Sequence, residues 1–322
     1  MNHRNRSSAT AFAPASVGNA AVGFDLLGFA IRGAGDTVTA TRSETPGVVI
    51  EAITGTVTDL PRDPDKNTAG KAVLAMLQSE RADFGVSLQI HKGIPLGSGL
   101  GGSAASASAA LMAVNALLDR PLETAALYRY ALIGETVASG SVHGDNVGPQ
   151  LLGGLVLASA EQLFRIPVPK GLYSAVVHPD HIVETRTARQ ALSEGFGIET
   201  IVAQQTRLAL FLSGCYRDDL ELIRAGLADV LVEPRRAHLI PGFSEVKQAA
   251  LDHGALGASI SGAGPSVFGW FESRDAAEDA GTAMVAAFGR HQLDATALVS
   301  PLDAPGARVL EDKSSPIEVR YP

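Results

Sequence analysis

A chain of 322 residues suggests one large domain or two ordinary ones. Its hydrophobic fraction of 46% is ample for a core, and its net charge of −8 at pH 7 argues against a nucleic-acid partner, which usually requires a basic face. The single cysteine, Cys215, excludes an intrachain disulfide framework and a cysteine-based zinc site. No apolar run reaches the ~18 residues needed to span a bilayer, and residues 1–14 lack the apolar stretch of a signal peptide. We therefore expect a cytoplasmic protein without a membrane partner.

The first predicted strand and loop lie in residues 9–24, which are rich in small residues and punctuated by proline and glycine before the apolar stretch 26–31. Asn19 and Asp25 are the strongly polar side chains of this segment. Polar residues in such a loop either satisfy the backbone of the turn or bind a ligand, and the pattern alone leaves both interpretations open.

Sheet and helix then alternate along the chain. Residues 36–57 alternate polar and apolar side chains, which predicts two strands of an antiparallel sheet. A helix is expected from about Thr68 to Ser79, with Asn67 suited to be its N-cap. Residues 86–92 are expected to form a strand that leads into a glycine-rich loop.

That loop opens the segment 95–110, PLGSGLGGSAASASAA, which has four glycines within six residues. The small helix formers after it predict a helix over residues 103–118. A loop at a helix N-terminus presents free backbone N–H groups and the positive end of the helix dipole, which suits a phosphate. No G-x-x-x-x-G-K-[ST] pattern occurs, so the loop is not a Walker A motif. A flexible turn before a buried alanine helix is the alternative that the spacing leaves open.

A second helix is expected over residues 124–140 and contains Glu135. His143, Asp145 and Asn146 then crowd a glycine-flanked turn before an apolar strand. These are ordinary turn residues, so a surface turn is the alternative to a functional site.

The composition changes around residues 162–170, QLFRIPVPK, where we place a domain boundary. Residues 254–271 then predict a strand, a glycine turn and a strand, and with the following helix and strand they form a split β-α-β pattern. The other elements expected in this half are strands at 172–178 and 294–299, and helices at 199–213, 218–228 and 274–289.

Three of these segments resemble the motifs of the GHMP kinases, in the order in which that family carries them. Residues 95–105 resemble P-x-x-x-G-L-G-S-S-A-A, with Gly102 where many members have the first of two serines. Residues 254–266 resemble G-A-x-G-x-x-x-S-G-x-G-P-[ST]. Residues 13–25 resemble the remaining motif as the homoserine kinases of this family carry it, A-P-A-[ST]-x-x-N-x-x-x-G-F-D. The segments 143–149 and 233–243 are also similar to those of homoserine kinases.

The resemblance implies an α+β chain with the two-domain GHMP kinase fold. It comprises an ATP-binding domain like ribosomal protein S5 domain 2 (residues 9–165), a ferredoxin-like domain (residues 166–305) and a surface tail (residues 306–322). The implied activity is ATP- and Mg²⁺-dependent phosphorylation of the L-homoserine hydroxyl, a step of threonine biosynthesis, by a homodimer. The alternatives are a kinase for another small alcohol such as mevalonate and an inactive GHMP-fold binding protein.

The resemblance also assigns residues to roles. The phosphate-binding segment comprises Pro95, Leu96, Gly97, Ser98, Gly99, Leu100, Gly101, Gly102, Ser103, Ala104 and Ala105, and Asn67 lies near the adenosine. The residues expected to bind the amino-acid substrate are Asn19, Asp25, Thr185, Arg189, Arg236 and Gly262. Arg235 is the alternative to Arg236, and Thr185 and Arg189 alone would read as a helix start with a solvated arginine.

The catalytic residues implied by the resemblance are Glu135, His143 and Asn146, and Ser103 and Glu135 are expected to orient Mg²⁺, which prefers oxygen ligands. Asn146 stands where other GHMP kinases have an aspartate that could act as a base. Phosphoryl transfer tolerates a missing base, because positioning and charge stabilisation serve its loose transition state.

Overall fold

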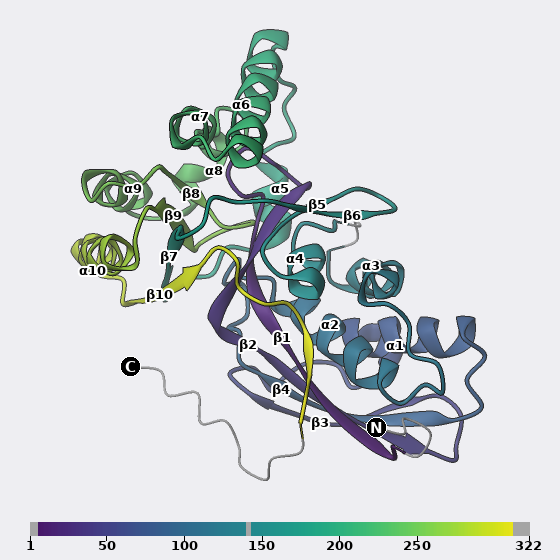
Figure 1. Cartoon of the computed structure of the whole chain (residues 1–322). Coiled ribbons are helices and arrows are strands. Elements are labelled where there is room, and N and C mark those ends of the chain that lie inside the picture. The colour runs from purple at the N-terminus through teal and green to yellow at the C-terminus, as the bar shows by residue number, and fades with distance from the viewer. Residues whose placement is uncertain (1–5, 140–142, 312–322) are drawn as a thin grey trace.

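The computed structural model describes residues 6–139 and 143–311, which form two units side by side (Figure 1). The first unit is built on a seven-stranded sheet in the order β11-β1-β2-β4-β3, with β5 paired to β2 and β6 to β5. Its strands are β1 (Ser8–Gly18), β2 (Leu27–Ser43), β3 (Val48–Gly55), β4 (Gly85–Lys92), β5 (Leu155–Ala158), β6 (Leu163–Ile166) and β11 (Arg308–Leu310).

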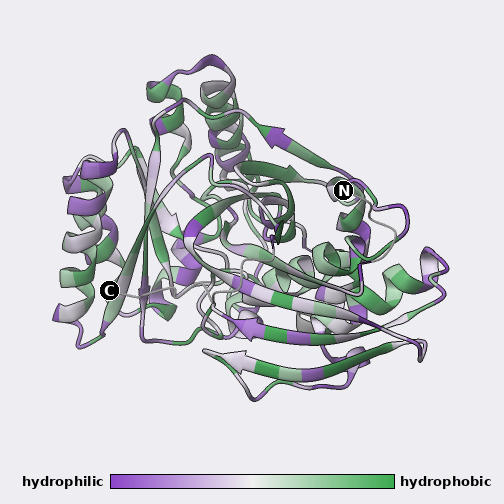
Figure 2. Cartoon of the chain, turned by 60° about the horizontal axis from the view of Figure 1, so that its bottom comes forward, coloured by the Kyte–Doolittle hydropathy of each residue, from purple (hydrophilic) through white to green (hydrophobic). Residues whose placement is uncertain are grey.

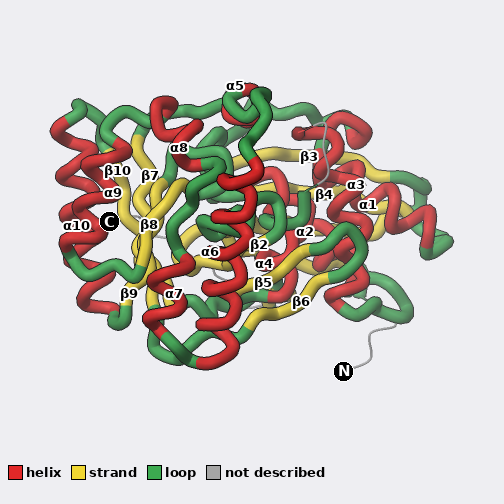
Figure 3. The backbone as a smooth tube through the Cα atoms, turned by 90° about the horizontal axis from the view of Figure 1, so that it is seen from above, coloured by secondary structure: helices red, strands yellow, loops and turns green. Residues whose placement is uncertain are grey.

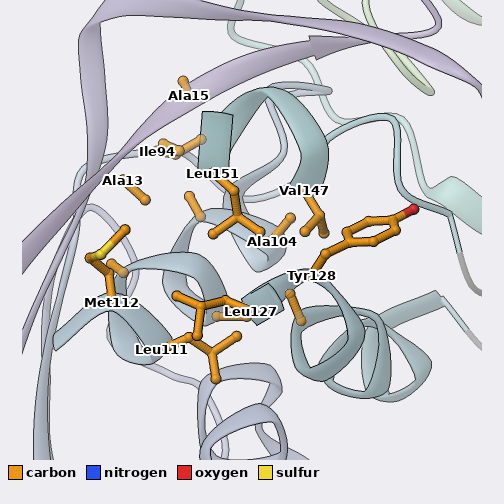
Figure 4. Packing of buried hydrophobic residues seen from close by; sticks show 14 of the residues in the cluster. Ala13, Ala15, Ile94, Ala104, Leu111, Met112, Leu127, Tyr128, Val147 and Leu151 are labelled. Atoms are coloured by element: carbon orange, nitrogen blue, oxygen red, sulfur yellow. The ribbon is translucent and has the colours of Figure 1, made fainter. Parts of the chain in front are cut away.

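Four helices of the first unit lie against this sheet (Figure 1). They are α1 (Thr68–Ser79), α2 (Gly102–Asn115), α3 (Tyr128–Ser139) and α4 (Val147–Leu152), with short 3₁₀ turns at Pro64–Lys66 and Thr124–Leu127. Every residue of α2 from Ala104 to Asn115 is buried, as expected of a helix that is apolar or small on all sides. Figure 4 shows its Ala104, Leu111 and Met112 packing among side chains of β1, α4 and the segment before α3.

The pairing of the first sheet differs from the sequence prediction in one respect. Residues 36–57 were expected to supply two antiparallel strands, but residues 36–43 continue β2, which starts at Leu27. The next strand, β3, pairs in parallel with β4 rather than with β2. The reason is the intervening helix α1, since parallel neighbours need a crossover connection.

The second unit is a four-stranded antiparallel sheet in the order β10-β7-β9-β8. Its strands are β7 (Tyr173–Pro179), β8 (Gly257–Ile260), β9 (Val267–Phe271) and β10 (Ala295–Pro301). Helices α9 (Phe243–Asp252) and α10 (Arg274–Arg290) cover its outer face (Figure 1). Their hydrophilic residues lie on the outside of the molecule (Figure 2).

Between β7 and α9 the chain forms a group of helices over the top of the molecule. They are α5 (Thr185–Gln190), α6 (Ile198–Arg217), α7 (Leu220–Gly226), α8 (Glu233–Arg236) and a 3₁₀ turn at Ala237–Leu239. Seen from above, α6 runs between the second sheet and the β5–β6 hairpin (Figure 3). The expected α+β architecture of two units is confirmed, while the boundary at residues 162–170 stays a prediction.

Four aromatic side chains pack together where the two units meet. Phe29 of β2 makes edge contacts with Phe268 and Trp270 of β9, at ring-centroid distances of 5.4 and 5.6 Å. Phe211 of α6 packs on Trp270 at 5.3 Å. All four side chains are fully buried. The units therefore share an apolar junction, which fixes their relative position.

The end of the described chain returns to the first sheet. Residues 308–310, expected within a surface tail, form β11 and pair antiparallel with Thr10–Phe12 of β1. The rest of that expected tail, residues 312–322, lies outside the described residues. Within residues 6–139 and 143–311, no helix is long and apolar enough to cross a membrane.

Candidate active site

A cavity of about 640 Å³ opens between the two units. The first unit contributes the loop after β4, the start of α2 and the β1–β2 turn, and the second contributes α5, α8 and residues 262–264. Every predicted site residue lines this cavity except Leu100, Ala104 and Ala105, whose side chains are buried in the core. The fold thus brings residues from distant parts of the sequence to one place.

The glycine loop has a backbone that other residues would rarely adopt. Gly97, Gly99 and Gly101 have φ angles of 66°, 76° and 70°. A Cβ atom at Gly99 would lie 2.5 Å from the carbonyl oxygen of Ser261. Gly101 is the N-cap of α2 and offers no side chain to its first N–H groups, which lie beside the cavity. This is the arrangement that suits an anion at a helix N-terminus.

The second unit braces the loop through two serines of its glycine turn. Ser261 Oγ donates to the carbonyl oxygen of Gly99 at 2.7 Å, and Ser266 Oγ donates to that of Ser98 at 2.7 Å. Through these bonds the glycine turn of residues 254–266 supports the glycine loop across the junction.

A buried ion pair that the sequence analysis missed lies beneath the loop. Lys92 pairs with Asp36, and its ammonium also donates to the carbonyl oxygen of Gly102 at 2.6 Å and to Ser106 Oγ at 2.7 Å. The signal was present, since the alternation that buries Val86, Leu88 and Ile90 also puts Lys92 on the inner face of β4.

Ser103 and Glu135 lie together at the start of α2. Ser103 Oγ donates to Glu135 Oε2 at 3.4 Å. Burial raises the pKa of Glu135 to about 7, although the Ser103 hydroxyl opposes this. A carboxylate and a hydroxyl facing the cavity are the hard oxygen donors that Mg²⁺ takes together with phosphate oxygens. No cluster of three or more acidic, histidine or cysteine ligands occurs in the described part of the chain.

The β1–β2 turn presents Asn19 and Asp25 in left-handed conformations, with φ angles of 68° and 59°. Asn19 Nδ2 donates to the carbonyl oxygen of Gly262 at 2.9 Å, and its Oδ1 accepts from the backbone N–H of Asp25 at 3.0 Å. Asp145 Oδ2 accepts from the backbone N–H of Asn19 at 3.0 Å. Burial, reinforced by the charge of Asp25, raises the pKa of Asp145 to about 6. Asp145 comes from the turn at residues 143–146, where the sequence analysis noted it without assigning it a role.

The charged side chains around Asp25 form a connected group. Arg189 donates two bonds to the carboxylate of Asp25, at 2.9 and 3.2 Å. His143 Nδ1 lies 3.2 Å from Asp25 Oδ2, and its Nε2 lies 2.9 Å from Arg189 Nη2. Because an arginine can only donate, Nε2 of His143 must accept, so the ring is neutral with its proton on Nδ1. Burial lowers the pKa of His143, which favours the same state.

Arg236 rather than Arg235 lines the cavity. Its guanidinium is buried and donates to the carbonyl oxygens of Ala188 and Gly262, at 2.9 and 3.1 Å. Burial and the charge of Arg189 lower its pKa to about 10. Arg235 instead donates to the backbone carbonyl oxygens of Glu194 and Gly195 at the surface.

Asn146 and Thr185 complete the lining. Asn146 Oδ1 accepts from Ser16 Oγ at 2.9 Å. Gln150 Nε2 donates to Ser16 Oγ at 3.0 Å and to the carbonyl oxygen of Gly101 at 2.8 Å, which ties Asn146 to the glycine loop. Thr185 is the exposed first residue of α5. Asn67 caps α1, as predicted, by accepting from the N–H groups of Ala69 and Gly70.

Comparisons with known proteins show which chains this one is similar to. The model of the GHMP kinases N terminal domain matches residues 67–154, and that of the GHMP kinases C terminal matches residues 211–291. A homoserine kinase of Xanthomonas campestris is 57% identical over 307 residues, 95% of each chain. The crystal structure of homoserine kinase from Cytophaga hutchinsonii superposes with a TM-score of 0.91 at 41% identity, covering 95% of this chain and 98% of the other. A mevalonate kinase of L. major, 16% identical with a TM-score of 0.68 and covering 95% of this chain and 99% of the other, shares the fold alone.

Proposed function

Since the chain belongs to the GHMP kinase family, we propose that it is a homoserine kinase, which transfers the γ-phosphoryl group of ATP to the side-chain hydroxyl of L-homoserine. The products are ADP and O-phospho-L-homoserine, an intermediate of threonine biosynthesis. One observation carries this proposal. A single cavity joins a glycine loop suited to phosphates with a group of opposite charges suited to an amino acid.

The phosphates of ATP bind along the glycine loop and the first turn of α2. Backbone N–H groups supply the contacts, because Pro95–Gly101 contains no lysine or arginine. The bonds from Ser261 and Ser266 hold the loop in its left-handed turns before ATP arrives. Such preorganisation lowers the entropic cost of binding.

The amino acid binds between Asp25 and the two arginines. Asp25 accepts the ammonium group, and Arg189 and Arg236 take the carboxylate, for which a guanidinium offers paired donors. Mevalonate has a carboxylate but no ammonium, so Asp25 would have no counterpart in that substrate. We therefore assign the hydroxyl acceptor to an amino acid.

The reacting hydroxyl lies beside Asn146 and His143. Neither is a strong base, since one is an amide and the other is a neutral imidazole held by Asp25 and Arg189. The rate then depends on the alignment of the hydroxyl with the γ-phosphorus and on stabilisation of phosphate charge. Asn146 contributes alignment because its amide is fixed through Ser16.

The Ser103–Glu135 pair fits Mg²⁺, which would neutralise charge on the phosphates when bound. Both donors are oxygens, they lie 3.4 Å apart, and the buried Glu135 carboxyl has a raised pKa that a cation would lower. A homodimer and a cytoplasmic location complete the proposal, and light scattering and cell fractionation test them.

The decisive experiment measures ADP release with Mg-ATP and L-homoserine, beside parallel reactions with mevalonate, L-serine and galactose. The proposal expects turnover with L-homoserine well above the others, lost on chelation of the metal. Turnover only with another alcohol would keep the phosphate loop but reject the amino-acid site. ATP binding without turnover on any alcohol would identify an inactive binding protein.

A further inference from the structure

Gln204 has a buried side-chain amide, although most residues around it in the N-terminal half of its helix are exposed. It lies on α6, where Ile198, Val202 and Gln205 are exposed while Gln204 is 7% exposed. Its Nε2 donates to the carbonyl oxygen of Val22 at 3.1 Å. Its Oε1 accepts from the backbone N–H of Val230 at 3.0 Å. One side chain thus bonds two backbone groups that are far apart in the sequence.

Both partners belong to segments that contain residues proposed to bind the substrate. Val22 lies in the turn between Asn19 and Asp25. Val230 follows Asp229, whose carboxylate accepts from three successive N–H groups and so sets the start of α8. That helix ends in Arg236. Gln204 is therefore a bridge of fixed length between the segment of Asp25 and the segment of Arg236.

We propose that Gln204 is a positioning residue, which sets the separation between Asp25 and Arg236 and thereby selects a substrate whose ammonium and carboxylate share one carbon. This inference rests on the proposed function. Its physical basis is that a buried amide with both ends bonded has little freedom to adjust. Gln204 does not line the cavity, so it acts through the two segments and not by contact with substrate.

The variant Gln204→Leu keeps the approximate size of the side chain and removes both bonds. We expect KM for L-homoserine to rise roughly 10- to 100-fold, the scale of two lost buried hydrogen bonds, while KM for ATP stays unchanged. The glycine loop is held by the hydrogen bonds from Ser261 and Ser266 and does not depend on Gln204. Discrimination against 4-hydroxybutyrate, which lacks the ammonium group, should shrink by a similar factor.

Two further variants sharpen the test. Gln204→Asn retains the amide on a shorter side chain that cannot reach both partners, and it should behave like Gln204→Leu. Gln205→Leu changes the exposed neighbour on the same helix and should match the wild type. Melting temperature is followed for all three.

The outcomes separate the inference from the proposed function. Unchanged KM and unchanged discrimination in both Gln204 variants would overturn the inference while wild-type turnover still upheld the kinase. Equal losses of homoserine and ATP affinity, together with a lower melting temperature, would reduce Gln204 to a general structural role and also overturn it. No homoserine turnover by the wild type would reject the proposed function itself.

Discussion

Removing the carboxylate of Glu135 should stabilise the free protein at alkaline pH while abolishing activity. Burial raises its pKa to about 7, against an ordinary value of 4.5. Below pH 4.5 the carboxyl is protonated in both the folded and the unfolded chain, so its burial does not lower the free energy of unfolding through ionisation. Between pH 4.5 and about 7 the unfolded chain has released this proton while the folded chain still holds it, so the folded state loses stability over this range. A difference of about 2.5 in pKa corresponds to about 3 kcal/mol.

The assay is urea unfolding of the wild type and Glu135→Gln at pH 5 and pH 8, with a chelator and without nucleotide. The free energy of unfolding of the variant should exceed that of the wild type by about 3 kcal/mol at pH 8 and by only about 1 kcal/mol at pH 5. Glu161→Gln, at an exposed turn, serves as the control and should show no such pH dependence. A stabilisation of equal size at both pH values would refute the reasoning, because it would owe nothing to ionisation.

Three other changes test the site and its support. Arg236→Leu should raise KM for L-homoserine by about 10- to 100-fold, as expected for loss of a charged hydrogen bond, with ATP binding unchanged; equal losses for both substrates would count against its role. Lys92→Met should lower the free energy of unfolding by roughly 3–5 kcal/mol, because it leaves Asp36 buried without its cation, and adding Asp36→Asn should restore much of it in urea titrations. Ser103→Ala should raise the Mg²⁺ concentration needed for half-maximal turnover, and an unaltered metal titration would remove Ser103 from the metal site.

Local patterns were sufficient to predict the glycine loop and the helix after it. Three glycines adopt positive φ angles, and a side chain at Gly99 would collide with backbone from the second unit. Each of these requirements restricts the residue type at a single position, so it can be recognised in the sequence. The same holds for Asn67, whose capping bonds join near neighbours.

Contacts between residues that are far apart in the sequence were harder to predict or could not be predicted. Lys92 could have been found from the alternation of β4, but nothing near it in the sequence indicates Asp36, which lies 56 residues earlier. Gln204 sits in an ordinary helical pattern, and only the tertiary structure brings Val22 and Val230 to it. The parallel pairing of β3 with β4 was missed for a related reason, since strand pairing depends on where the connecting helix packs.

The overall fold does not identify the substrate, whereas the charged side chains of the cavity restrict which substrates fit. The mevalonate kinase at 16% identity shares the fold alone, and a shared fold does not identify a substrate. In the free site Asp25 is neutralised internally, by two bonds from Arg189. If Arg189 binds the substrate carboxylate as proposed, a zwitterionic substrate brings an ammonium group that replaces Arg189 at Asp25, whereas a simple carboxylate would leave Asp25 partly buried without that cation. Since uncompensated charge in such a site is costly, the Asp25–Arg189 pair favours an amino acid over an acid that lacks the ammonium group.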